Sequence, residues 1–179
     1  MIQIGQASAT IDTPVEHLMA CHRRIEDRLA TLARAGDHLR EDRPAALEAI
    51  RRSILFLDSS GVLHTRDEEE SLFPKLRPHL SPEELQFLDG LEEQHRAAES
   101  VFTELRDVAE ELATAADNSV SVERRYKKLA ARLSALYLPH IQSEDEILTT
   151  LARRTLTDDE LRVIAEEMKE RREQRKHPL

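Results

Sequence analysis

Apolar residues recur three and four positions apart along most of the 179-residue chain, and interruptions of this spacing divide it into segments. The spacing is typical of amphipathic α-helices, whose apolar residues lie on one face. Proline at a first helical position, with a glutamate three residues after a capping residue, marks helix starts at Thr13 and Ser81. We predict helices over about 14–35, 42–73, 82–116, 122–152 and 158–176.

Glycine and proline residues modify these helices. Gly36 is expected to end the first helix, because glycine favours the left-handed position after a helix end. Pro74 is expected to end the second helix, because proline lacks the amide hydrogen that a helix interior requires. The second pattern also weakens near 59–61, and Pro139 predicts a kink in the fourth helix.

The apolar stripes of the first four helices predict an all-α fold, an up-down-up-down four-helix bundle over residues 13–152. Residues 1–12 form an N-terminal extension in this interpretation, and 153–179 a charged C-terminal helix and tail. The weak stripe of Leu161, Ile164 and Met168 predicts an appended surface helix or a contact to a second subunit, which would make a homodimer. The expected stripes comprise Val15, Leu18, His22, Ile25, Leu29 and Leu32; Leu47, Ile50, Ile54, Leu57, Gly61, His64 and Glu68; Leu88, Leu91, His95, Ala98, Phe102, Leu105 and Leu112; and Tyr126, Leu129, Leu133, Leu136, His140 and Ile147.

Composition agrees with a helical protein and narrows its partners. Hydrophobic residues make up 40% and charged residues 34%, with only 4 glycines, which favours long amphipathic helices. The single Cys21 excludes a disulfide framework and fits a reducing compartment. No membrane span or secretion signal is visible, so a cytoplasmic location is expected. The formal charge of -9 argues against binding to nucleic acid.

One histidine interrupts each of the four stripes, and a glutamate follows each of these histidines four residues later. Residues i and i+4 lie on the same helix face, so both side chains could reach one ion. With 8 histidines and 23 glutamates in 179 residues, composition alone gives about one such pair, whereas the chain has five, one of which straddles a helix start at His79. The four remaining pairs are His22/Glu26, His64/Glu68, His95/Glu99 and His140/Glu144.

These eight residues are the candidate metal ligands. Burying so many ionisable groups without a partner would cost several kcal/mol per charge, and bound cations would offset that cost. Mixed imidazole and carboxylate ligation suits iron or manganese, with zinc as an alternative, and a lone cysteine excludes a thiolate site. Glu26 and Glu144 fall at the edges of their stripes, where a solvated side chain is the alternative. Glu69 and Glu70 are expected to face water or to orient ligands.

Other polar residues have simpler interpretations. A core position is favoured for Tyr137, with hydrogen bonding to a bound oxygen species or ligation as the alternatives. The remaining histidines are expected to be structural or exposed, and Cys21 to be a buried, inert thiol. These remaining histidines are His17, His38, His79 and His177.

Four segments carry a resemblance to a known family: HRRIE at His22, HTRDEEESLFP from His64, EQHRAAE around His95 and PHIQSED around His140. Together they resemble the hemerythrin-like HHE cation-binding domain, over most of the chain. The resemblance implies a four-helix bundle that holds two non-haem irons with an oxo or hydroxo bridge. It further implies iron ligands at His22, His64, Glu68, His95 and His140, with Glu144 or Asp145 as a bridging acid.

Departures from the family pattern bear on function. Oxygen-carrying hemerythrins have a histidine where this chain has Glu99, and carboxylate in its place favours the ferric state. Reversible oxygen carriage is therefore less favoured than the binding or sensing of dioxygen, nitric oxide or iron, or than peroxide chemistry.

Three rival interpretations remain open from the sequence. The first is an oxidase or peroxidase-like enzyme that uses the same di-iron centre. The second is a helical interaction module whose histidines are incidental. The third is a ferritin-like bundle, but its Glu-x-x-His signature occurs only at Glu92 and His95.

Overall fold

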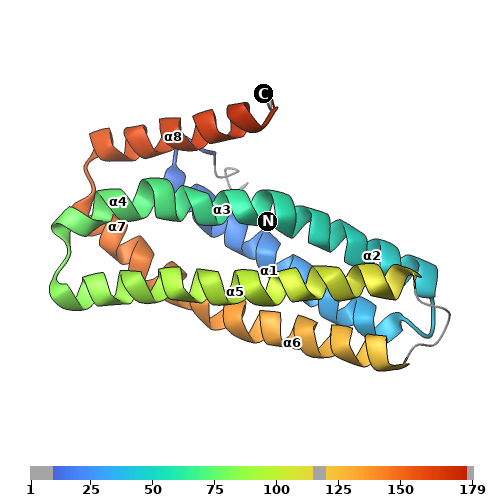
Figure 1. Ribbon diagram of the computed structural model, residues 1–179. Helices are drawn as coiled ribbons and strands as arrows, with labels where there is room; N and C mark the ends of the chain where they lie inside the picture. Colours follow the sequence, from blue (N-terminus) through green and yellow to red (C-terminus); the bar gives the residue numbers. More distant parts are fainter. Residues whose placement is uncertain (1–9, 115–119, 177–179) are drawn as a thin grey trace, which may run out of the picture.

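The computed structural model describes residues 10–114 and 120–176, and four long antiparallel helical runs lie side by side within them (Figure 1). The first run is α1 (Pro14–His38) and the third is α5 (Pro82–Thr114). The second joins α2 (Arg43–Phe56), η1 (Leu57–Gly61), α3 (Val62–Asp67), η2 (Glu68–Leu72) and α4 (Phe73–Leu76), and ends in a 3₁₀ turn, η3 (Arg77–His79). The fourth joins α6 (Val120–Ser143), η4 (Glu144–Leu148) and α7 (Thr149–Thr155), and α8 (Asp158–Lys176) follows it. The predicted all-α up-down-up-down bundle is confirmed.

Helix starts follow the capping signals at three of four places. Reciprocal bonds join Ser81 to Glu84 and Thr157 to Glu160, with backbone N–H to carboxylate distances of 2.8 Å in both boxes. Asp42 accepts from the amide of Ala45 at 3.1 Å. Thr13 precedes α1 as expected, but its hydroxyl donates to a carbonyl oxygen in the preceding turn and does not cap the helix.

Gly36 does not end the first helix, which continues to His38. A Cβ atom at this position would lie only 3.0 Å from Cε1 of Tyr126. The glycine therefore serves the close approach of α1 to α6 and not a helix stop.

Pro74 does not end the second run either, because a π-helical turn precedes it. In η2 the amide of Phe73 donates to the carbonyl of Glu68, five residues back. This wider turn accommodates a residue that cannot donate an i−4 bond. The weak pattern near 59–61 corresponds to a second π-helical turn, η1, and α6 runs through Pro139.

The predicted stripes form the core, with one shift of register. Most stripe residues are buried, whereas Ile147 is 44% exposed and Leu148 is buried in its place. Both residues belong to the π-helical turn η4, whose wider spacing moves the inward face by one position. The apolar core divides into two clusters, which lie on either side of the histidine positions along the chain.

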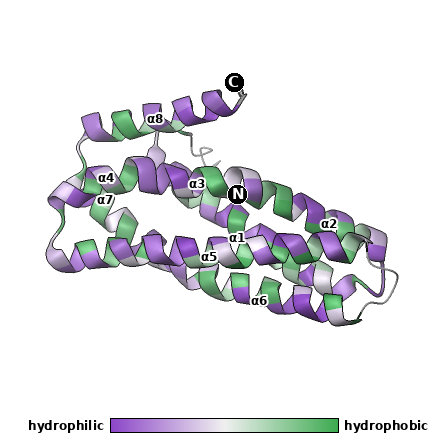
Figure 2. Ribbon diagram, in the orientation of Figure 1, coloured by the Kyte–Doolittle hydropathy of each residue, from purple (hydrophilic) through white to green (hydrophobic). Residues whose placement is uncertain are grey.

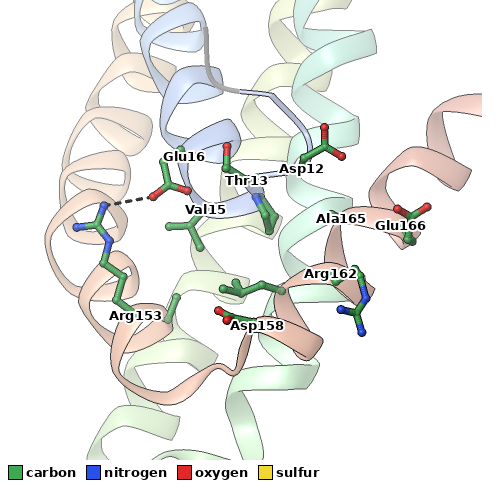
Figure 3. Close-up of a pocket in the computed structure, with 12 residues that line it drawn as sticks. Asp12, Thr13, Val15, Glu16, Arg153, Asp158, Arg162, Ala165 and Glu166 are labelled. Atoms are coloured by element: carbon green, nitrogen blue, oxygen red, sulfur yellow. Dashed lines mark hydrogen bonds and ion pairs between the residues drawn. The ribbon is translucent and has the colours of Figure 1, made fainter. Parts of the chain in front are cut away.

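The helix α8 packs on the bundle against α3, η2 and α1 (Figure 1). Its stripe residues Ile164 and Met168 are fully buried against the bundle, which confirms an appended helix. Figure 2 shows that polar residues otherwise dominate α8. Beside the first half of α8, a cleft of about 460 Å³ lies between this helix and the start of α1. Arg153 and Glu16, which both line the cleft, form an ion pair at 3.4 Å (Figure 3).

Some expectations fall on segments outside the described residues, and others concern single features. The segments outside are 1–9 of the N-terminal extension, most of the connection at 117–121, and the tail with His177. Cys21 is buried as expected, and burial raises the pKa of its thiol. Among the described residues, no helix combines the length and the apolar character that a membrane span needs.

Candidate metal centre

Four histidines and two glutamates converge between the four helical runs. His22 comes from α1, His64 from α3, His95 from α5 and His140 from α6. Glu68 opens η2 and Glu144 opens η4. None of the six side chains is more than 7% exposed. We call these six residues the histidine–glutamate centre.

The carboxylate of Glu144 lies between two pairs of histidines, His22 with His64 and His95 with His140. Its Oε2 atom is 3.1 Å from Nε2 of His22 and 3.2 Å from Nε2 of His140. Its Oε1 atom is 3.8 Å from Nε2 of His95. One carboxylate therefore reaches both sides of the centre.

The carboxylate of Glu68 has a matching position. Its Oε1 atom is 3.3 Å from Nε2 of His64 and 3.6 Å from Nε2 of His22. Its Oε2 atom is 3.5 Å from Nε2 of His95. The imidazoles themselves form two pairs, His22 with His64 and His95 with His140, whose ring centroids are 4.7 and 4.6 Å apart.

The inward atoms of the centre lack hydrogen-bond partners among the described residues. These atoms are Nε2 of His22 and His95, and both carboxylate oxygens of Glu68 and Glu144. Such buried orphans are costly, and a cation would satisfy them. The donor atoms could hold cations as two groups, His22, His64, Glu68 and Glu144 on one side and His95, His140 and Glu144 on the other. The residues present thus fit iron or manganese, the metals that mixed imidazole and carboxylate donors suit.

Outer contacts aim three of the four rings inward. Nδ1 of His22 donates to Asp145 at 2.7 Å, and Nδ1 of His95 donates to Glu69 at 2.8 Å. Nδ1 of His140 lies 2.9 Å from the amide oxygen of Gln94. A donor role for Nδ1 leaves the Nε2 lone pair for a cation. Nδ1 of His64 has no hydrogen-bond partner among the described residues.

The two halves of the centre repeat one arrangement. The second and the fourth helical runs each carry an acidic triplet, 68–70 or 144–146, which starts four residues after a histidine. The first acid faces the centre, and the second binds Nδ1 of a histidine on another run. The third acid, Glu70 or Glu146, pairs outward with a side chain of the surface. A π-helical turn spans each triplet, and such turns are frequent at functional sites.

Burial and the two carboxylates have opposite effects on the pKa of His22. Burial lowers the pKa of His22, but Glu144 and Glu68 outweigh it and raise the value to about 9. Burial and the charge of Glu144 raise the pKa of Glu68. Burial acts in the same sense on Glu144, yet His140 and His22 bring its pKa well below the ordinary value. The free centre near pH 7 therefore contains a protonated His22, an ionised Glu144 and a protonated Glu68.

The other two affected histidines are neutral in the free centre. Burial lowers the pKa of His64 well below its ordinary value, and the positive charge of His22 adds to this effect. Burial also lowers the pKa of His95. Neutral imidazoles are the form that binds a metal, so these two rings are ready for a cation without losing a proton.

Two of the eight expected ligands lie apart from the centre. Glu26 is half-buried and pairs with Arg23 at 2.8 Å. Glu99 is exposed and lines a pocket beside the centre. All four glutamates share the i+4 spacing, so spacing alone could not separate them. The acidic triplets could have done so, because of the four glutamates only Glu68 and Glu144 are followed directly by two further acids.

The outer contacts were only partly foreseen. A role in orienting ligands was expected for Glu69, and Asp145 was expected as an alternative bridging acid; the structure places both against Nδ1 atoms. Gln94 was not singled out, and nothing in its sequence context marks it. The other described histidines lie away from the centre and have their own partners; for example, His38 contacts a backbone carbonyl and His79 pairs with Glu160.

A pocket of about 310 Å³ adjoins the His95 side of the centre. Apolar side chains such as Leu57 and Phe102 line it together with Tyr137, Glu69 and Glu99. Burial and the nearby carboxylates raise the pKa of Tyr137 to about 12, so its hydroxyl keeps the proton at neutral pH.

Comparison with known proteins gives two matches. A family model described as "Hemerythrin HHE cation binding domain" matches residues 13–152. A protein from Haemophilus influenzae, described as "Uncharacterized protein", is 28% identical over 170 residues, which cover 94% of this chain and 95% of the relative. The range matched by the family model contains all six residues of the centre.

Proposed function

The chain belongs to the hemerythrin HHE cation-binding family, and we propose that it holds two iron ions and uses them to bind or sense a small ligand. The ligands proposed are dioxygen, nitric oxide and peroxide. One observation carries the proposal: each of two buried carboxylates, Glu68 and Glu144, reaches a histidine of both pairs. A single cation would not need two such carboxylates between two separate imidazole pairs.

The proposed ligands are the six residues of the centre. His22 and His64 would hold one ion, His95 and His140 the other, with Glu68 and Glu144 between them. Asp145 then orients His22 from outside, which favours Glu144 over Asp145 as the bridging acid. Iron bound by imidazole and carboxylate donors would supply a redox-active ion with positions open to an added ligand, and manganese or zinc are the alternatives.

The position of Glu99 changes the reasoning about oxygen. The sequence favoured the ferric state on the premise that Glu99 is a ligand, whereas this side chain lies in a pocket wall. The His95 side is therefore left with two imidazoles and the shared carboxylates. Fewer protein donors on that side leave room for an added ligand, which supports binding or sensing.

An oxidase or peroxidase-like activity is the second candidate, because the pocket beside His95 gives a small substrate space next to the centre. Catalytic turnover of peroxide by the iron-loaded protein, at a rate altered by Glu99→His, would support the enzyme. Binding of one ligand per centre without turnover would support the sensor.

The remaining proposals concern context. We propose a cytoplasmic protein without a nucleic-acid partner. A homodimer through α8 would have to use its outer face, where Val163 is 42% exposed, because the stripe of α8 is buried on its own bundle.

Metal analysis tests the proposed centre. Protein produced with added iron and then dialysed should contain about two irons per chain and absorb in the near ultraviolet when oxidised. The chain has no Trp, so a metal-free sample would absorb little there. Less than about one metal per chain would favour the helical interaction module instead.

A further inference from the structure

The pocket on the His95 side connects the surface with the interior of the bundle. Exposed Glu99 and buried His95 both line it, so it extends from solvent to a residue of the centre. Its volume of about 310 Å³ is at the lower end of the range for small-molecule sites. The lining includes two glutamates and two arginines, whose formal charges balance, so the lining has no net formal charge that would repel a small anion.

Tyr137 also lines this pocket, next to the centre. Its ring packs edge-on against the ring of His140, with centroids 6.3 Å apart. The charges of Glu68, Glu144 and Glu99 all act on its hydroxyl. The phenol therefore lies within the electrostatic influence of both carboxylates of the centre, and it also lines the pocket.

The hydroxyl of Tyr137 is uncommitted within the described part of the chain. It forms no hydrogen bond with another described residue, and the side chain is half-buried in the wall of the pocket. The other tyrosine, Tyr126, shows the usual arrangement: its buried hydroxyl donates to the carbonyl of Leu32 at 3.0 Å. A pocket-lining phenol without such a bond has a donor to offer to a small molecule in the pocket.

We propose that this pocket is the entry and binding position of the small ligand, and that Tyr137 donates a hydrogen bond to it beside His95 and His140. The inference rests on the proposed function, since it assumes cations in the centre. It narrows the ligand class to small molecules with an accepting terminal atom, such as dioxygen, peroxide, nitric oxide or azide. Tyr137 acts on the guest by donation and not as a metal ligand, so its removal should leave the metal content unchanged.

Azide binding tests the donor. Oxidised, iron-loaded protein is titrated with azide, and the dissociation constant is read from the absorption band of the complex. Tyr137→Phe should weaken azide about tenfold, the value of one hydrogen bond to a charged acceptor, with the same iron content. Tyr126→Phe is the matched control, because it removes a phenol hydroxyl outside the pocket. Equal azide affinity in Tyr137→Phe and the wild type would overturn the donor role.

A second pair of variants tests the entry route. A Cβ atom at Gly61 would meet only atoms of Leu57, at 3.7 and 3.8 Å, so a larger side chain there extends into the pocket. Gly61→Leu should slow azide association at least about tenfold, because the pocket is the route. Gly90→Leu is the control, since a Cβ there meets nothing within 4 Å and Gly90 does not line the pocket. Unchanged association in a folded Gly61→Leu protein would overturn the route.

The outcomes separate this inference from the proposed function. Wild-type protein that retains no metal overturns both. Wild-type protein that holds two irons but binds neither azide nor nitric oxide overturns the ligand-binding function. If the wild type binds azide, and neither the azide affinity of Tyr137→Phe nor the association rate of Gly61→Leu differs from the wild-type value, only the inference is overturned.

Discussion

At the scale of single residues, three neighbouring acids in each triplet have three different environments. Glu68 is fully buried between histidines, Glu69 binds Nδ1 of His95, and Glu70 pairs with Arg66 at the surface. The same order recurs at 144–146. A π-helical turn spans each triplet, and its wider spacing lets the first acid face the centre while the second reaches the outer side of a neighbouring histidine ring.

Glu68→Gln separates metal binding from folding. In the free centre Glu68 already carries a proton, so a neutral amide should change the metal-free stability by less than about 1 kcal/mol. The added stability from metal, about 3 kcal/mol at a free concentration about 100 times Kd, should be lost. Melting curves with and without iron, together with metal analysis, check this result.

Glu123→Gln is the control for this variant. Glu123 is also buried, but it pairs with Arg40 at 3.1 Å and is not part of the centre. Its replacement should lower stability with and without metal by similar amounts. Full retention of iron by Glu68→Gln would contradict the proposed bridging role.

The pH dependence of metal uptake follows from the protons in the free centre. The pKa of His22 is raised to about 9 and that of Glu68 is raised as well, so both groups are protonated at pH 7. A cation must displace these protons, so affinity should rise with pH between 6 and 9, by about tenfold per unit for each proton released. Competition with a coloured chelator at several pH values measures this, and a flat profile would count against it.

At the scale of the helices, the periodicity of the sequence predicted the helices and the residues that face the core, but it missed the π-helical turns beside the centre. The five helices and four inward histidines follow from the 3.6-residue period and from capping signals. The π-helical turns could not be predicted, because they arise from contacts between helices. Pro74, where the expected helix end was wrong, follows such a turn, and Ile147, where the expected inward position was wrong, lies within one. The i+4 spacing alone also does not separate the inward glutamates from the other two, although the acidic residues that follow Glu68 and Glu144 mark them in the sequence.

Two glycine substitutions should have opposite effects on stability. Alanine favours a helix over glycine by about 1 kcal/mol, so Gly90→Ala, with open space around its Cβ, should stabilise the protein by nearly that amount. Gly36→Ala should destabilise it by about 1–3 kcal/mol, because its Cβ would press on a fully buried Tyr126. Urea unfolding of the two variants gives both values. Stabilisation by Gly36→Ala would show that α6 can move away.

At the scale of the whole molecule, α8 is joined to the bundle by a buried ionic cluster beside the centre. Asp67 is fully buried and pairs with Arg171 and, at 2.6 Å, with Arg172 of α8. Arg171 also donates to Ser71 at 2.9 Å. Asp67 directly precedes Glu68, so the contact that holds α8 and the proposed metal ligand share one turn of helix.

Asp67→Asn should loosen α8. The substitution leaves the buried Arg171 without its main counter-charge, which should cost about 3 kcal/mol or more. Trypsin should then cleave the arginine-rich α8 before the bundle, and mass spectrometry of the fragments would locate the cuts. Asp89→Asn removes only the surface pair with Arg77, and should change stability by less than about 1 kcal/mol. Resistance of Asp67→Asn to trypsin would show that apolar packing alone holds α8.

The two halves of the centre differ in the contacts that hold their histidine rings from outside. Gln94 steadies His140, whereas Nδ1 of His64 has no such neighbour among the described residues. Two positions with similar donors but unequal support cannot share one binding constant. A half-loaded chain would then be a defined species with its own spectrum, and the second ion would arrive at a partner already altered by the first.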